Sequence, residues 1–444
     1  MRGELYQSRR PDDGVLLLRP HNGKQMIAGV DLAPVIIPVS IDENCFETVH
    51  VTPRLEEFLG GQIFLQQVID FPSTGRKRRL FVAEAQNGSG AEWSWLPVDE
   101  HRSDLADVLK SEFAGAVYLD RFCESVADQL SGMSPLPWCK PGWFQALLRR
   151  IKDYFSEPTE VHPYKLRVGY VILRAANSQG MYELHAVAPC STSWWTSDSL
   201  YSADMRDLLQ GWKPEVVASF PDLGIEIRKA PLGTSLARLG DLASWSPAMR
   251  AVADFQMRAS TIVDSSGSIE PGALSARFNL CLQEWRAHAS NSDGFGKRSL
   301  KWIQDSVSEA SELLYKSVLP QTLINGALAS FTIFCEGSRI QVSEWEPIYI
   351  THPFTTLARL LSHRSGALAK YASADLARPF VGAWLRVGRP IDVSQEVRAG
   401  VIVGSAIQAT VAWERGRAFA TSGIPSLETQ VADLCQIILR ITQD

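Results

Sequence analysis

The sequence predicts an α+β fold, in which a small mixed α/β domain precedes a larger part that starts with strands and becomes mainly helical. Three observations predict this fold. Short apolar runs separated by turn residues, which are typical of strands, fill the first part of the chain and return after residue 160. After about residue 240 the hydrophobic spacing is mainly helical, with one further hairpin among the helices. No GxGxxG or Walker A motif is present, so a doubly wound nucleotide-binding sheet loses its main support.

Residues 1–130 form the predicted small α/β domain. The apolar runs at 62–69 and 79–84 flank turn residues at 72–75 and therefore predict a hairpin, and helical spacing follows from Asp104 to Leu130. Residues 131–160 are predicted as a linker and a helix, because Gly, Pro and Ser are concentrated at 131–137 and a helical pattern covers 146–151.

Strands return in the segment 161–235. The runs 166–174 and 181–187, with the turn residues Asn177–Gly180 between them, predict a second hairpin. Residues 236–444 are predicted to be mainly helical. In this part Ser246-Pro247 is expected to start one helix and 300–314 to form another. A third hairpin is predicted over 329–346, and the chain is expected to be helical from there to its end.

The composition narrows the range of functions. Hydrophobic residues make up 45% and charged residues 21% of the 444 residues, which is typical of a globular protein of two or three domains. The net charge of −5 argues against a dedicated nucleic-acid-binding protein. No apolar run is long enough to span a bilayer, and the first residues lack the apolar core of a signal peptide. We therefore expect a cytoplasmic protein with no nucleic-acid or membrane partner. Seven cysteines without a CxxC pair argue against a disulfide framework or a zinc site.

One stretch carries a resemblance to a known family. Residues 319–333, LPQTLINGALASFTI, resemble the catalytic stretch LPxTLxHGDLHxGNI of the aminoglycoside phosphotransferase (kinase-like) family. Glu344-Trp345 stands where that family has Asp-Trp after a hairpin, and 352–360 resembles the family's continuation. The resemblance covers about residues 160–390. It implies a bilobal protein-kinase-like domain, with a small lobe at 161–235 and a helical lobe at 236–444.

The family's working residues are replaced at most of the matching positions. Phosphoryl transfer needs a carboxylate that orients the attacking hydroxyl, a lysine on the phosphates, and an Asn and an Asp that hold magnesium. His185 stands at the position of the lysine and Ala327 at that of the catalytic Asp. Thr332 and Glu344 stand at the positions of the magnesium Asn and the magnesium Asp. The two histidine positions beside the catalytic Asp carry Asn325 and Ala329. Only Glu344 keeps a carboxylate suited to magnesium.

The resemblance and these replacements together predict a pseudokinase-like binding or regulatory protein, which lacks the catalytic Asp, the Lys and the metal-binding Asn. On this reading no residue is catalytic, His185 stands at the nucleotide position, and Thr332 and Glu344 stand at the metal positions. The alternative is an ATP-dependent small-molecule phosphotransferase, or a nucleotide-using enzyme, whose chemistry has moved to other residues such as His185, Glu344 or Asp198. A third hypothesis is a structural subunit that uses an aromatic surface for assembly.

Expected ligands and partners follow from the same reading. No cofactor is expected, although an open cleft would leave room for ATP and Mg²⁺. The partner is expected to be a protein or a small molecule, and the sequence leaves the oligomeric state open. The N-terminal domain resembles the Nudix-like segment that precedes kinase-like domains in some bacterial proteins, through its strand order and the run Trp93–Glu100. It lacks the clustered glutamates that pyrophosphate hydrolysis needs, which predicts a structural or docking domain.

Overall fold

The structure is a computed structural model. It describes residues 13–21, 24–30, 33–34, 36–39, 48–59, 62–71, 78–86, 94–112, 136–167, 170–187, 202–264, 267–288, 295–345, 348–362, 366–388, 392–418 and 424–443. The predicted turn at 72–75, the linker residues 131–135 and Asp198 lie outside these ranges.

The chain divides into two compact units. The first, here called the sheet unit, contains residues 1–190 together with 216–229 and 415–427. The second, called the helical unit, contains residues 191–215, 230–414 and 428–444. This composition confirms the predicted class, a mixed fold with a sheet-rich N-terminal part and a mainly helical C-terminal part.

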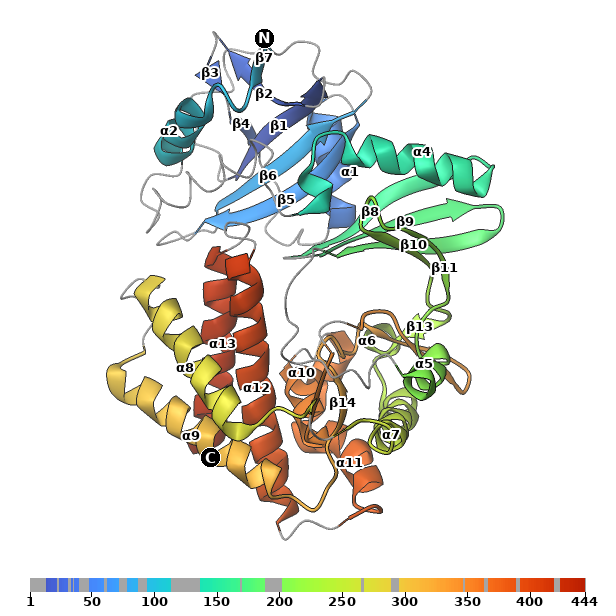
Figure 1. Ribbon diagram of the computed structural model, residues 1–444, viewed down its shortest axis with the longest axis vertical. Helices are drawn as coiled ribbons and strands as arrows, with labels where there is room; N and C mark the ends of the chain where they lie inside the picture. The colour runs from blue at the N-terminus through green and yellow to red at the C-terminus, as the bar shows by residue number, and fades with distance from the viewer. Residues whose placement is uncertain are drawn as a thin grey trace. The chain divides into compact units, whose positions relative to one another are not determined.

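A mixed seven-stranded sheet opens the sheet unit (Figure 1). The strands are β1 (Asp13–His21), β2 (Lys24–Val30), β3 (Ala33–Pro34), β4 (Ile37–Val39), β5 (Ile63–Phe71), β6 (Arg78–Ala85) and β7 (Ser94–Pro97). Their order is β3-β2-β1-β6-β5, with β4 on β1 and β7 on β2, and only β1 and β6 run parallel. The predicted hairpin is the antiparallel pair β5–β6.

Side-chain alternation places a helix on each face of this sheet. Leu16 and Val82 pack in one cluster with Leu105 of α2 (Arg102–Glu112). Leu17 and Phe81, one residue along their strands, pack in another cluster with Leu55 of α1 (Thr48–Leu59). The result is a three-layer α/β domain. Helix α2 ends at Glu112 in the structure, and the rest of the predicted helix lies outside the described residues.

The second sheet of the same unit is fully antiparallel. It is formed by β8 (Glu160–Arg167), β9 (Tyr170–Asn177), β10 (Gly180–Val187), β11 (Val216–Phe220) and β12 (Ile225–Lys229), in the order β11-β12-β10-β9-β8. The predicted hairpin is β9–β10, in which Asn177 pairs with Gly180. The predicted strand 166–174 is wrong in its bounds, because Arg167 pairs with Tyr170 and the chain therefore reverses inside it.

A helix links the two sheets. Helix α4 (Trp143–Phe155) packs Leu147 and Ile151 against Leu173 of β9. Phe64 of β5 joins the same cluster and stacks on Phe144, with ring centroids 4.4 Å apart. The first sheet therefore contributes Phe64 to the hydrophobic core between α4 and the second sheet.

A buried carboxyl group also joins the first sheet to this helix. Glu84 of β6 is fully buried and accepts hydrogen bonds from the side chains of Gln66 and Gln86, each at 3.1 Å, and from the backbone of Gly142 at 3.4 Å. Gly142 is the N-cap residue of α4, and no side-chain hydrogen bond of its own caps the helix. Burial raises the pKa of Glu84, and the hydrogen bonds from Gln86 and Gly142 oppose only part of that rise.

The helical unit contains most of the helices. They are α5 (Ala203–Gln210), α6 (Leu236–Leu239), α7 (Leu242–Ala259), α8 (Pro271–His288), α9 (Lys297–Tyr315), α10 (Thr356–Ser362), α11 (Ser373–Trp384), and most of α12 (Val393–Ala418) and α13 (Ile424–Gln443). Among the described residues of the chain, no helix has the length and apolar character needed to cross a membrane.

Two expectations for this unit were wrong. Helix α7 begins at Leu242, where the Asp241 carboxylate caps it by accepting from the Ser244 backbone at 2.7 Å, and Pro247 lies inside the helix. The chain is also not wholly helical after the third hairpin, since β17 (Ile348–Thr351) pairs with β14 (Thr322–Asn325). The hairpin itself is confirmed as β15 (Ile333–Glu336) and β16 (Arg339–Val342).

Two glycines let α12 approach the chain after β17 closely. A Cβ atom at Gly400 would lie 2.6 Å from Cβ of Phe354, and one at Gly404 would lie 2.6 Å from Cβ of Ala358. Real Cβ atoms do not come this near to other atoms, so the small side chains are a packing requirement.

Candidate functional site

The loop between β14 and β15, residues 326–332, holds three of the six predicted site positions. Strand β14 is completely buried and ends at Asn325, and β15 is paired on one side with β16 and on the other with β13 (Thr234–Ser235). The loop is therefore fixed at both ends by paired strands, of which β14 is buried along its whole length. Ala327, Ala329 and Thr332 are themselves buried.

Asn325 connects the start of this loop to Glu344. Its side-chain amide donates to the backbone oxygen of Glu344 at 2.7 Å, and its side-chain oxygen accepts from the backbone of Ala327 at 2.8 Å. The structure thus brings Asn325, Ala327 and Glu344 together, as the predicted site requires. Both polar atoms of the Asn325 side chain are engaged with backbone.

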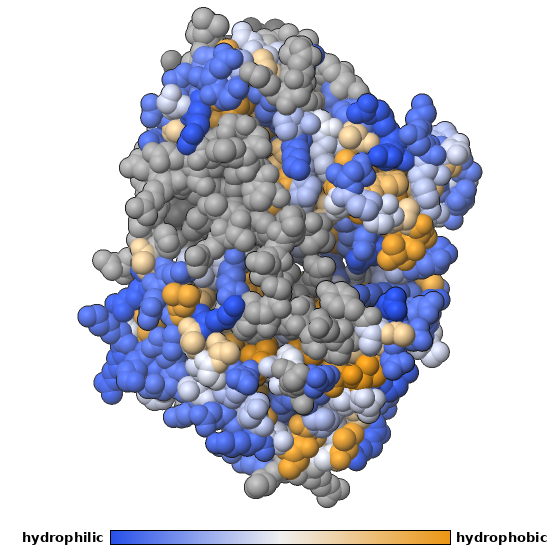
Figure 2. Space-filling model, in the orientation of Figure 1, coloured by the Kyte–Doolittle hydropathy of each residue, from blue (hydrophilic) through white to orange (hydrophobic). Residues whose placement is uncertain are grey.

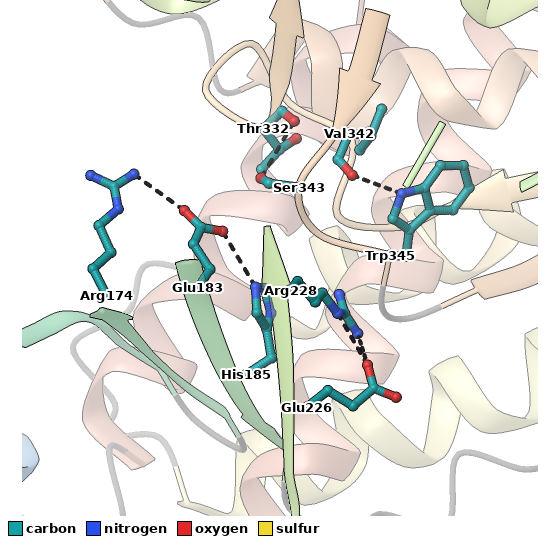
Figure 3. Close-up of polar contacts among 9 residues, drawn as sticks. All are labelled: Arg174, Glu183, His185, Glu226, Arg228, Thr332, Val342, Ser343 and Trp345. Carbon is teal, nitrogen blue, oxygen red and sulfur yellow. Dashed lines mark hydrogen bonds and ion pairs between the residues drawn. The ribbon is translucent and has the colours of Figure 1, made fainter. Parts of the chain in front are cut away.

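Thr332 closes the same loop from its other end. Its hydroxyl accepts from the backbone of Ala329 at 2.9 Å and lies 3.1 Å from the backbone oxygen of Ala327 and 3.0 Å from that of Ala329. A hydroxyl has one hydrogen, so it donates to one of these two oxygens or shares the hydrogen between them. The carbonyl oxygen of Thr332 accepts from the backbone of Ser343 at 3.0 Å and from the Ser343 hydroxyl at 3.5 Å, the contact drawn in Figure 3.

The residue after Glu344 is anchored in the core of the helical unit. The indole of Trp345 donates to the backbone oxygen of Val342 at 2.8 Å (Figure 3) and meets the ring of Phe255 edge to face, with centroids 5.5 Å apart. The ammonium of Lys213 lies 5.4 Å from the Trp345 ring. These contacts hold the backbone of Glu344, whose side chain is mostly buried and has further interactions.

The chemistry open to this loop is limited by its side chains. Alanine at 327 and 329 offers no side-chain acceptor, donor or metal ligand. Asn325 and Thr332 have polar side-chain atoms, but these bind backbone groups of the loop and of Glu344. In the described part of the chain, no group of three or more His, Cys, Asp or Glu side chains is placed to hold a metal ion. The loop geometry is that of a structural turn.

His185 belongs to the sheet unit, on β10. The antiparallel register places Glu183 opposite Arg174 of β9 and Arg228 of β12, and His185 opposite Glu226. Figure 3 shows these five side chains on one face of the sheet. The opposite face carries the apolar residues that pack on α4.

Ion pairs organise this polar face. Glu183 lies 3.2 Å from Arg174 and 3.3 Å from Nε2 of His185, and it is only 2% exposed. Glu226 accepts from Nε of Arg228 at 3.0 Å. Burial alone would raise the pKa of Glu183, but the hydrogen bond from His185 and the charges of His185, Arg174 and Lys165 together lower the pKa below its usual value. Glu183 is therefore an ionised partner for His185.

The sequence reading missed Glu183, Arg174 and the Glu226–Arg228 pair. Their signal was present, because Glu183 and His185, and Glu226 and Arg228, are each two residues apart and so share one face of a strand. Reading the alternation for its polar face as well as its apolar face would have found them.

A second polar cluster in the helical unit has the residue types of a hydrolytic triad. The hydroxyl of Ser317 donates to Glu396 at 2.7 Å, and Nε2 of His352 lies 3.2 Å from that hydroxyl and 3.3 Å from Glu396. However, Nδ1 of His352 accepts from the backbone of Phe354 at 3.3 Å, so the proton of the neutral ring is on Nε2. The ring then cannot take the proton of Ser317, and the geometry does not support nucleophilic catalysis.

Solved structures with a similar course of the chain are phosphotransferases. A thermostable mutant of aminoglycoside phosphotransferase APH(4)-Ia is 14% identical over 66% of this chain and 98% of that one, with a TM-score of 0.45. Choline kinase LicA from Streptococcus pneumoniae is 9% identical over 67% and 99%, with a TM-score of 0.46. Choline kinase from Cryptosporidium parvum is 12% identical over 67% and 95%, with the same score. Similarity at this level concerns the fold alone.

No protein-family model matches the chain, and the search of curated proteins found no similar sequence.

Proposed function

We propose that this protein is a pseudokinase-like binding protein, built on an aminoglycoside phosphotransferase-like scaffold whose catalytic loop has become a structural loop. One observation carries the proposal. The side chains of Asn325, at the family's first histidine position, and Thr332, at its magnesium-Asn position, bind the backbone of Glu344, Ala327 and Ala329. The mapping of these positions rests on the resemblance of residues 319–333 to the family's catalytic stretch.

The replacements remove the main sources of rate acceleration. Phosphoryl transfer depends on positioning and on charge stabilisation by the base, the metal ligands and the lysine. Losing one such electrostatic contact typically costs about 10²–10³ in rate. Here the base position is Ala327, and the lysine position is His185, which is shorter and paired with Glu183. At the two predicted metal positions the family uses an Asn and an Asp. This chain has Thr332 and Glu344 there, so only Glu344 offers a carboxylate to a metal ion.

The retained scaffold favours binding over turnover. The candidate ligands are a small molecule, a nucleotide that is bound without hydrolysis, or a partner protein. The N-terminal domain, for which we propose a structural or docking role, is fixed to the second sheet by the Phe64–Phe144 stack and by Glu84 at the N-cap of α4. A partner on that domain would therefore bind a rigid extension of the sheet that carries His185.

The test measures nucleotide binding and turnover separately on the full chain. Purified protein is incubated with ATP and Mg²⁺ and with a panel of hydroxyl and amine acceptors, and ADP and phosphorylated product are quantified. Thermal shifts with ATP, ADP and adenosine report binding, because a ligand that binds the folded state raises the melting temperature. We expect no product, whichever nucleotide shifts the melting temperature.

Glu344→Ala decides between this proposal and an enzyme with relocated chemistry. The matched control is Glu336→Ala, which removes an exposed carboxylate at the end of β15. Product formation that is lost in Glu344→Ala and kept in Glu336→Ala would contradict the proposal and support an ATP-dependent phosphotransferase.

A further inference from the structure

A groove between α7 and α11 gathers positive charge on a chain that is acidic overall. On the face drawn in Figure 2, the coloured hydrophobic residues form small separate patches among hydrophilic ones. The groove has a volume of 440 Å³, and Arg250, Arg378, Arg386 and Asp375 line it. These four side chains sum to +2, whereas the whole chain carries −5.

The two helices present matching rows of side chains to the groove. On α7 the row is Leu242, Ser246 and Arg250, and on α11 it runs from Arg378 through Gly382 to Arg386 just beyond the helix end. Residues four apart lie on the same face of a helix. A Cβ atom at Gly382 would meet no other atom within 4 Å, so the groove is open at this point.

The groove has a rigid base. The helices α7 and α11 pack side by side (Figure 1), and the buried indole of Trp245 on α7 donates to the backbone oxygen of Leu376 on α11 at 2.8 Å. Leu242, Pro379 and Ala383 supply apolar surface. Ligand sites of this size are commonly apolar with a few charged groups that fix the orientation of the ligand.

Two of the three arginines have an acidic neighbour, and both of these pairs are exposed to solvent. Arg378 pairs with Asp375 at 2.9 Å, and Arg386 reaches Asp254 only at 3.9 Å, in both cases between well-exposed side chains. Exposed pairs of this kind contribute little, and a guanidinium presents several further donors. Guanidinium groups bind phosphate through two parallel hydrogen bonds, which lysines cannot reproduce.

We propose that this groove binds a small organic phosphate ester, with its phosphate between Arg250, Arg378 and Arg386 and its apolar body over Gly382. The charge selects the phosphate, the apolar base selects the body, and the volume limits the ligand to a small molecule. The site uses none of the residues of the 325–332 loop, so it stands independently of the proposed function.

The experiment is calorimetric titration of the full chain at low ionic strength with three probes: phenyl phosphate, inorganic phosphate and phenol. We expect saturable binding of phenyl phosphate, weaker binding of inorganic phosphate, no binding of phenol, and loss of affinity as salt is added. Arg250→Ala is expected to weaken phenyl phosphate by about tenfold or more, the effect of losing a charge-assisted hydrogen bond.

Two further variants separate a binding site from a structural role. Gly382→Leu fills the groove with a good helix former and should abolish binding while the protein stays folded. Asp375→Asn removes the carboxylate that competes for Arg378 and should tighten binding several-fold. Arg149→Ala, an exposed arginine on α4, is the matched control and should bind as the wild type does.

Several results would overturn the proposal. Absence of saturable binding of phenyl phosphate, or binding unaffected by both Arg250→Ala and Gly382→Leu, would contradict the site. Tighter binding of a phosphoserine peptide than of phenyl phosphate would overturn the small-molecule assignment.

Discussion

The side chain of Asn325 joins the backbone of Glu344 to the backbone of Ala327, across distances of 2.7 Å and 2.8 Å. The family that residues 319–333 resemble has a histidine at the position of Asn325 and the catalytic carboxylate at the position of Ala327. In this chain the Asn325 side chain holds the loop in place, and the Ala327 side chain has no functional group. The loop is therefore expected to respond to mutation as a folding element.

Replacing Asn325 should be costly for stability. Asn325→Ala leaves the buried Glu344 oxygen and the Ala327 amide without this partner, and each unsatisfied buried group costs about 1–3 kcal/mol. We expect a fall of about 2–4 kcal/mol in the free energy of unfolding, measured by urea denaturation.

The control for Asn325 is Asn177, whose side-chain oxygen also accepts from the backbone two residues later, at 2.9 Å in an exposed turn. Water replaces that contact, so Asn177→Ala should cost less than about 1 kcal/mol. Equal losses in the two variants would contradict the structural role of Asn325.

The stability of the sheet unit should fall as the pH rises, because of Glu84. Its folded-state pKa lies above the value of 4.5 for an exposed glutamate, mainly through burial. The protonated Glu84 contributes its full stabilisation of the folded state below pH 4.5. This contribution is lost as the pH rises through the raised pKa, and it amounts to about 1.4 kcal/mol for each unit by which the pKa is raised.

Melting temperatures measured from acid to neutral pH check this sign. In Glu84→Gln the side chain does not titrate, so the decline with rising pH should be smaller than in the wild type. Glu57→Gln changes an exposed carboxyl of α1 and should leave the decline as it is. A wild type and a Glu84→Gln variant with the same pH dependence would refute the prediction.

His352 should have the opposite effect at acid pH. Burial lowers the pKa of His352 below 6.5, and its contacts with Glu396 oppose only part of that change. Since the unfolded chain then binds a proton more readily, stability is present above pH 6.5 and is lost as the pH falls through the lowered pKa.

Thermal unfolding between pH 7.5 and 5 measures this loss. His352→Gln should flatten the acid limb, even though it lowers stability at neutral pH by breaking the contacts with Ser317 and Glu396. His162→Gln is the control, because the His162 side chain is 70% exposed. An acid limb that is as steep in His352→Gln as in the wild type would show that another group controls it.

Two helical glycines should respond to alanine with opposite signs. Gly404→Ala places a methyl group against Thr355 and Ala358, and overpacking of this kind costs about 1–3 kcal/mol. Gly382→Ala meets open space and should stabilise the chain by about 0.5–1 kcal/mol through helix propensity. Urea denaturation of both variants gives the comparison, and a stabilised Gly404→Ala would contradict the close packing of α12.

Local patterns predicted the three hairpins β5–β6, β9–β10 and β15–β16, because turn residues and strand residues are adjacent in sequence. The pairing of β14 with β17 was not predicted, since it joins segments separated by the whole β15–β16 hairpin. The start of α7 was misplaced because the sequence offers two candidate N-cap residues, Asp241 and Ser246. In the structure the Asp241 side chain accepts from the backbone of Ser244, so the helix already begins at Leu242.

The sequence predicted which residues of the 325–345 segment lie close together, but not the hydrogen bonds that they make. The spacing of residues 325–345 indicated that Asn325, Ala327 and Glu344 come together, and they do. The engagement of Thr332 with the backbone of Ala329 depends on how the loop folds, which residue types alone do not specify. The pairing of His185 with Glu183 required the polar face of a strand to be considered.

The close approach of α12 through Gly400 and Gly404 has a consequence for recognising distant relatives of this protein. The steric demand at the two glycines does not depend on which side chains the 325–332 loop carries. We therefore expect homologues with unrelated loop sequences to keep Gly, or at most another very small residue, at these two positions. A sequence profile that weights this glycine spacing after the His352–Pro353–Phe354 segment should detect such homologues. Bulky residues at both positions in chains of the same fold would show that α12 can pack in another way.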